Sequence, residues 1–442
     1  MGQPLVTTRS TALALWLSAG AIASARADDA PAAREPDVRA LVAQALQEQS
    51  PTDQPAPRTA GHDSKGSFIA DQEGNFRLSL RSQIQFRWMA SLRDEGDVDL
   101  NGSEEDDFEA GFQTRRTKLI AEGHAFDPSL TFKLQGAVSR INGDMILEDA
   151  FWAYAWDNGW AITVGQFKLP FWREELIGST SQLAVEQSIV SEAFNSDYSQ
   201  GVQGSWTGES VRAFLAFSDG LQARNSDFSS PRRYTPQGLP LATLLGESDY
   251  AVTGRVEFKH GDGWSRFRDY TSEEEAPIAL LLGASAHVEG GERRRDAAAS
   301  YIVASWAADA QLEGDGWTLS LAGVGSHTDL NARDGLRDSL DDFGVVSHAG
   351  VRIPGTAFEP FLQYAVLLPD PDRTGGGGVR AFNALTIGFN YYLYGHAAKF
   401  TADMVWRPDD QSVLFGPRTS GGHLGDDDPH ELTLRLQWQL LF

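Results

Sequence analysis

The stretch LTLRLQWQLLF, residues 432–442, alternates apolar and polar side chains almost without interruption. As a β-strand it places Leu434, Leu436 and Trp438 on one face and Arg435 and Gln437 on the other, because side chains alternate sides along a strand. A soluble protein would have to cover the apolar face with a second layer. In a membrane barrel, lipid covers that face and the polar face lines a watery lumen. The stretch therefore predicts a strand of a transmembrane β-barrel.

The same alternation begins at Phe76 and recurs along the chain. From Phe76 to Trp88 the apolar residues oppose a face of arginine, serine and glutamine, which cannot be a packed core. Short connections, such as Asp157-Asn158-Gly159 and Asp315-Gly316, alternate with long ones. Runs of alternation between these connections predict an all-β, antiparallel transmembrane barrel of about 16 strands. Residues 260–277 do not fit, because a charged segment stands where a short turn is expected.

The start of the chain predicts export. Residues 12–23 form an apolar stretch that follows Arg9 and is too short to cross a bilayer as a helix. Ala25-Arg26-Ala27 fits a signal-peptide cleavage site, so residues 1–27 are expected to be a signal peptide. The chain has no cysteine, which excludes disulfides, thiolate metal sites and thiol catalysis.

Residues 28–65 form a region of different character before the barrel, which we expect to span 66–442. Apolar residues between Val38 and Leu46 follow a helical stripe, and prolines from Pro51 to Pro57 end it. We expect a short periplasmic helix and a proline-rich linker. A small coiled coil that supports an oligomer is the alternative, since one or two heptads are compatible with it.

Charge restricts the partners. The chain has 37 Lys and Arg against 61 Asp and Glu, a formal net charge of −24. This acidic balance disfavours nucleic-acid binding. It leaves ion selectivity open, because much of the acid lies in predicted loops such as 94–109 and the charge of the lumen governs permeation.

One segment indicates a family. Arg115-Arg116-Thr117-Lys118, then Leu147-Glu148-Asp149-Ala150-Phe151, then Gly165-Gln166-Phe167-Lys168-Leu169-Pro170-Phe171 follow in this order and are succeeded by Glu174-Glu175-Leu176. Between Thr114 and Trp206 this ordered set resembles the phosphate-selective porin O and P family. The resemblance implies a 16-stranded, usually trimeric diffusion channel of the outer membrane. It also implies that residues 169–198 are a loop that folds inward and narrows the lumen.

Anion selectivity would require cationic groups spaced along the lumen, which replace part of the hydration shell of an oxyanion. The predicted pore-lining and anion-binding residues are Arg77, Arg81, Arg87, Arg116, Lys118, Lys133, Lys168, Arg173 and Arg255, with Lys399 and Arg435 also on polar faces. The alternative is an ordinary polar lumen in which acids balance these bases, with Glu122, Asp149, Glu257, Glu359 and Asp403 as candidates.

The sequence thus predicts an outer-membrane porin through which small anions diffuse, with phosphate or polyphosphate first by resemblance. A general or weakly cation-preferring porin for small hydrophilic nutrients is the alternative. The expected partners are small anionic solutes, outer-membrane lipid and lipopolysaccharide, and two further copies of the chain in a homotrimer. No catalytic residue, metal site, cofactor or nucleic-acid partner is predicted.

Two further patterns in the sequence are weaker. Asp97-x-Asp99-x-Asn101-Gly102 resembles the opening of a calcium-binding loop, but Phe108 stands where a bidentate acid is expected, so a solvated acidic loop is the alternative. Histidines such as His287 and His348 are available for an enzyme, but none lies in a recognisable catalytic signature.

Overall fold

The computed structural model describes residues 59–63, 66–93, 108–139, 142–194, 196–221, 223–225, 245–293, 296–329, 339–374, 381–409 and 430–442. They belong to one compact unit that begins at Pro57. The predicted signal peptide, the predicted helix and the Asp97–Gly102 loop lie outside the described residues. No helix among the described residues is long and apolar enough to cross a membrane.

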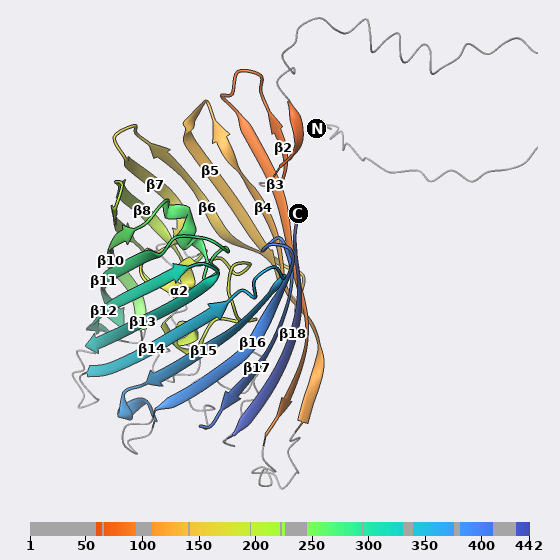
Figure 1. Ribbon diagram of the computed structural model, residues 1–442. Helices are drawn as coiled ribbons and strands as arrows, with labels where there is room; N and C mark the ends of the chain where they lie inside the picture. The colour runs from red at the N-terminus through yellow and green to blue at the C-terminus, as the bar shows by residue number, and fades with distance from the viewer. Residues whose placement is uncertain are drawn as a thin grey trace, which may run out of the picture. The chain divides into compact units, whose positions relative to one another are not determined.

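Sixteen strands of the described chain form a closed antiparallel barrel, as the alternation predicts (Figure 1). Each pairs with the next, and the last strand pairs with the first from Leu432↔Leu92 to Leu441↔Gln83, which closes the ring. Closure leaves no open sheet edge facing lipid. The strands are β3 (Arg77–Leu92), β4 (Phe108–Ala125), β5 (Asp127–Val138), β6 (Met145–Ala155), β7 (Trp160–Lys168), β8 (Tyr198–Thr207), β9 (Val211–Ser218), β10 (Leu245–His260), β11 (Ala279–Arg293), β12 (Asp296–Gly314), β13 (Trp317–Asp329), β14 (Ser339–Val351), β15 (Phe358–Leu368), β16 (Phe382–Tyr394), β17 (Ala398–Arg407) and β18 (Glu431–Leu441).

A short hairpin completes the seam. β1 (Ala60–Asp63) pairs with β2 (Gly66–Ala70), and β2 pairs with β3 from Ser67↔Leu80 to Ala70↔Arg77. This is the part of β3 that lies beyond the end of β18, where Phe442 exchanges two backbone hydrogen bonds with Ser82. The hairpin therefore covers the stretch of β3 edge that the C-terminal strand leaves unpaired. β1 lies at the end of the segment predicted to be a linker.

The two faces of the barrel follow the predicted alternation in β3 and β18. Leu80, Ile84 and Phe86 are exposed on the outside, as are Leu434 and Trp438. The inward residues of the same strands are buried polar groups: Ser79, Gln83, Gln85, Arg87, Thr433, Arg435, Gln437 and Gln439. Such an outer face suits contact with hydrocarbon.

Short and long connections alternate around the barrel, as predicted. The short ones include Phe126, residues 156–159, residues 208–210, residues 315–316 and residues 395–397, while residues 169–197 form one of the long ones. Two helices, α2 (Arg173–Leu176) and α3 (Ile189–Phe194), lie in that long connection. The 3₁₀ helices are η2 (Trp264–Arg268), between β10 and β11, and η3 (Pro371–Thr374), between β15 and β16.

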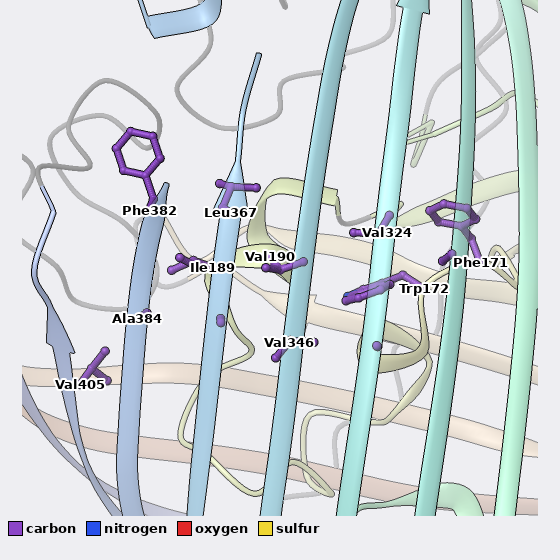
Figure 2. Close-up of a cluster of buried hydrophobic side chains, with 13 residues drawn as sticks. Phe171, Trp172, Ile189, Val190, Val324, Val346, Leu367, Phe382, Ala384 and Val405 are labelled. Atoms are coloured by element: carbon purple, nitrogen blue, oxygen red, sulfur yellow. The ribbon is translucent and has the colours of Figure 1, made fainter. Parts of the chain in front are cut away.

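The inner face is not polar throughout, which corrects the sequence-based expectation. On the inside of β12 to β17 the wall carries a buried apolar patch of small and medium side chains: Ala307, Ala322, Val324, Val346, Ala365, Leu367, Phe382, Ala384 and Val405. Phe171, Trp172, Ile189 and Val190 of the long connection pack against it (Figure 2). The wall is apolar here because it is covered by protein instead of water.

The outward placement of Leu436, near the middle of β18, generates a prediction. Leu436→Arg puts a charge on the lipid face and is expected to lower the free energy of unfolding in a bilayer by about 2 to 4 kcal/mol. Leu432→Arg, at the end of the same strand, is the matched control and is expected to cost about 0 to 1 kcal/mol. Urea unfolding of both variants in lipid vesicles measures the difference, and equal small costs would contradict the assignment of this face.

Candidate functional site

The long connection between β7 and β8, residues 169–197, lies inside the barrel, as the family resemblance implies. Near its start, Ser285 Oγ on β11 donates to the carbonyl oxygen of Phe171 at 2.9 Å. Further along, the backbone N–H of Val185 donates to Asp403 Oδ2 on β17 at 2.8 Å. The connection therefore reaches widely separated strands of the wall. We call residues 169–197 the constriction loop.

Two consecutive acids tie the start of the constriction loop to its end. The carboxylate of Glu174 accepts from the backbone N–H and the hydroxyl of Ser188, at 2.7 and 2.6 Å. The carboxyl of Glu175 accepts in the same way from Ser196, at 2.9 and 2.5 Å. Burial raises the pKa of the Glu175 carboxyl from its ordinary 4.5 to about 7. These bonds hold the loop in a compact form.

A second segment also folds inward, from the side of the short turns. Tyr270, in the connection of residues 261–278 between β10 and β11, is buried and packs with Ile177 and Leu183 of the constriction loop. Its ring stacks on His348 of β14 with centroids 4.4 Å apart. The Arg173 guanidinium of the loop donates to the carbonyl oxygen of Phe267. We call residues 261–278 the inner turn.

The inner turn explains the charged segment that the strand pattern could not accommodate. Its Arg266 pairs with Glu313 of β12 at 2.9 Å. The backbone carbonyl of Asp269 accepts from Gln311 Nε2 of the same strand, also at 2.9 Å. Polar residues that look misplaced in a simple turn are therefore the contacts that hold this turn against the inner wall.

A β-bulge positions a cluster of three guanidinium groups. In the pairing of β3 with β4, Gln85 opposes Arg116 but Phe86 opposes Thr114, so Arg115 is an extra residue. The bulge lets adjacent arginines reach the same carboxylate. Arg115 donates to Glu186 of the constriction loop, Arg116 does so at 2.7 Å and Arg87 of β3 at 2.6 Å.

A second bulge, in the pairing of β5 with β6, places two acids on the inner wall. Gln135 of β5 opposes Asp149 of β6, whereas Gly136 opposes Leu147, so Glu148 is the extra residue. Lys118 pairs with Glu148 at 2.5 Å, and Lys133 pairs with Asp149 at 2.6 Å. Both bulges coincide with segments that carry the family resemblance. Those segments therefore encode local geometry that departs from strict alternation.

Each of the nine predicted pore-lining residues has a partner. The structure brings these residues together in two groups. One is Arg87 and Arg116, which both bind Glu186. The other is Lys118 and Lys133, which bind the acids at the second bulge. The other ion pairs are Arg77 with Asp63, Arg81 with Glu122, and Arg255 with both Glu257 and Asp309. Lys168 donates to the carbonyl of Glu175, and Arg173 donates to Gln311 as well as to Phe267.

The nine predicted pore-lining side chains differ in how far they are exposed. The Arg87 and Arg255 side chains are 0% exposed, whereas Arg81 is 21% exposed. A solute in the lumen can contact Arg81 without any rearrangement of the protein. The role of all nine residues in anion binding stays a prediction.

Sequence reasoning missed several basic residues, among them Arg115, Arg212 and Arg224. Arg115 was assigned to no site, since strict alternation turns it away from its neighbour Arg116. Arg212 pairs with Glu257, and Arg224 pairs with Asp197 at 3.3 Å. The alternation of β9 could have identified Arg212, because it is flanked by Val211 and Ala213. Arg224 lies in a connection, where no periodic signal exists.

Among the described residues, no group of three or more histidines and acids is arranged to hold a metal ion. The chemical groups that face the interior are guanidinium, ammonium, carboxylate and amide. Such a set can bind and exchange hydrated ions through charge-assisted hydrogen bonds. It is suited to guiding solutes through a lumen.

The raised pKa of Glu175 predicts a pH dependence of stability. Its folded pKa of about 7 lies above the ordinary 4.5, so the folded state binds the proton more tightly than the unfolded state does. The stabilisation is therefore present at low pH and is lost as pH rises from 4.5 through 7. Unfolding midpoints measured across this range are expected to fall for the wild type and to change less for Glu175→Gln. Identical pH profiles of the wild type and Glu175→Gln would contradict the burial of this carboxyl group.

Comparisons with known proteins agree with this geometry. Residues 90–238 match the model of the phosphate-selective porin O and P family. No curated protein matches the chain. The fold is similar to that of the anion-selective porin from Comamonas acidovorans, with a TM-score of 0.56, 11% identity, and coverage of 83% of this chain and 99% of that one. It is also similar to in-vitro folded OmpT, an outer membrane protein of Vibrio cholerae, with a TM-score of 0.52, 7% identity, and coverage of 83% and 97%. Residues 90–238 therefore carry the sequence pattern of the phosphate-selective porin O and P family, and the fold of the chain is similar to that of solved outer-membrane porins.

Proposed function

We propose that this porin lets small anions diffuse passively across the outer membrane, with phosphate or polyphosphate as the leading solutes. The phosphate assignment rests on the family match of residues 90–238. The fold-similar porin from Comamonas acidovorans is described as anion-selective, which supports the wider class. No energy source or covalent step is required, since solutes move down their gradient.

The observation that carries the proposal is that, in two ion pairs, the cationic side chain is more exposed than its carboxylate partner. Lys133 is 29% exposed and its partner Asp149 only 8%. Arg212 is 24% exposed and its partner Glu257 only 1%. In these pairs the cation faces the accessible space and the carboxylate lies behind it. A hydrated ion that approaches this surface meets the positive group first.

The cluster on Glu186 supports the same preference. Three guanidinium groups, from Arg87, Arg115 and Arg116, share this one carboxylate. Arg115 and Arg116 are each 17% exposed and Glu186 only 7%, so in this cluster too the cations are more accessible than the carboxylate. Guanidinium groups form paired hydrogen bonds with oxyanions, which favours phosphate over cations of similar size.

A general or weakly cation-preferring porin for small hydrophilic nutrients is the second candidate. It is favoured by the pairs in which acid and base are similarly exposed. Lys118 and Glu148 are 10% and 11% exposed, and Arg81 and Glu122 are 21% and 26% exposed. Where both partners meet water equally, the local field largely cancels.

We further propose that the porin assembles as a homotrimer in outer-membrane lipid, with lipopolysaccharide around its outer rim. This assembly follows from the family resemblance. Chemical cross-linking of the detergent-purified protein, followed by denaturing electrophoresis, distinguishes a trimer from a monomer.

The reversal potential in a planar bilayer under a KCl gradient tests the selectivity. We expect an anion-selective potential and a chloride current that added phosphate reduces. Lys133→Glu is expected to shift the potential towards cation selectivity, because it reverses the charge of an accessible group. Lys133→Arg keeps the charge and serves as the control. A cation-selective wild type that phosphate does not affect would favour the second candidate.

A further inference from the structure

The inner wall is unevenly covered. Along β10 to β18 the inward-facing polar residues are almost inaccessible, as Gln363, Thr401 and His287 illustrate at 4%, 1% and 1% exposure. Along β4 to β9 many inward-facing positions are half-exposed or exposed, including Lys133 and Thr131. Both parts of the wall carry charged and polar inward groups, and the apolar patch lies on β12 to β17.

The cause is that two chain segments lie mainly over the first of these parts of the wall, while Glu186 of the constriction loop also reaches Arg87 of β3 and Arg116 of β4. The constriction loop packs its apolar side chains on β12 to β17 and hydrogen-bonds to β16, where Asn390 donates to the carbonyl of Leu183 at 3.1 Å. It also reaches β17, where Lys399 donates to the carbonyl of Gln182 at 2.6 Å.

The inner turn covers the other end of that part of the wall. It contacts β12 through Arg266 and Gln311, and β14 through the stacking of Tyr270 on His348. It extends to β15 and β16, where the Thr271 hydroxyl lies 3.3 Å from Glu359 Oε2 and 3.1 Å from the Tyr392 hydroxyl.

The loop and the turn are joined to each other, so they form one continuous cover. Tyr270 packs on Ile177 and Leu183, and Arg173 of the loop donates to Phe267 of the turn. Arg173 itself is buried. Removing this cover from the wall would expose apolar surface and leave charged groups without partners, which is costly.

We infer that solutes cross the barrel only along the wall formed by β5 to β9, and that the part of the lumen lined by β10 to β18 is filled and structural. β3 and β4 border this path through their ion pairs with Glu186 of the constriction loop. On this path Lys133 is a selectivity-determining residue, and so is Arg212 at its edge, where the guanidinium lies 4.5 Å from the ring centroid of Trp264 in the inner turn.

Arg255 and Lys399 donate to backbone carbonyls of the cover and do not contact the solute. Arg435 pairs with Asp403, which itself accepts from the Val185 N–H of the cover. The inference rests on the proposed function as a diffusion channel.

The absence of cysteine makes the inference directly testable, because each introduced thiol is the only one in the chain. Thr131→Cys and Ser205→Cys lie on the accessible wall. Thr131 is two residues from Lys133 and so shares its face, and Ser205 is three residues from the lipid-facing Val202. Thr401→Cys lies under the cover, where the wild-type hydroxyl donates to Asn390 Oδ1 at 2.7 Å.

The probe is the anionic reagent 2-sulfonatoethyl methanethiosulfonate, applied to the full-length porin in bilayers and in detergent. We expect the thiols at 131 and 205 to react at least about tenfold faster than the thiol at 401, because a covered thiol reacts only when its cover opens. Mass spectrometry measures the rates, and single-channel conductance is expected to fall only for the first two variants.

Equal reaction rates at 131 and 401 in a conducting channel would overturn the inference. Thr386→Cys is the second covered position, 3% exposed on β16, in case Thr401→Cys fails to assemble. A protein that does not conduct at all would contradict the proposed function instead. The two failures are distinguishable because the reaction rates are measured independently of current.

Discussion

The structure depends on one apolar contact inside the barrel. Phe171, Trp172, Ile189 and Val190 of the constriction loop bury their side chains against the apolar patch of β12 to β17. Each large apolar side chain removed from water in this way contributes about 1.5 to 3 kcal/mol. The driving force exists on the inner face because water is the competing solvent there, whereas lipid competes on the outer face. This contact fixes the loop across the lumen and determines which charged groups remain accessible.

The position of the charges then follows from backbone geometry. A regular strand presents every second residue to the lumen, so it cannot offer two adjacent charges to one partner. The bulges at Arg115 of β4 and Glu148 of β6 remove that restriction at two points of the wall. One concentrates guanidinium groups on Glu186, and the other supplies carboxylates that lie beside Lys118 and Lys133. The electrostatic potential along this wall of paired charges is therefore uneven.

Sequence periodicity predicts the features that depend only on the alternation of apolar and polar residues. The strands of residues 76–88 and 432–442, their lipid-facing sides, the short turns and the number of strands all follow from alternation. Periodicity cannot predict Arg115, because a bulge shifts the register by one residue. Nor does it separate Val346 or Val405, which face inward under the loop, from apolar residues that face lipid. The inner turn was also beyond reach, since its partners His348 and Glu359 are distant in sequence.

The central claim, that the constriction loop is held against the inner wall, is tested most directly by a disulfide between them. A Cβ atom at Gly344 on β14 would lie 2.6 Å from Val190 Cγ1, so the pair Val190→Cys and Gly344→Cys is within bonding reach. The chain contains no other cysteine. Mild oxidation of the folded protein is predicted to form this bond while the barrel and its conductance persist, as measured by non-reducing peptide mapping and current recording. Two thiols that stay reduced in a fully assembled, conducting channel would contradict the account.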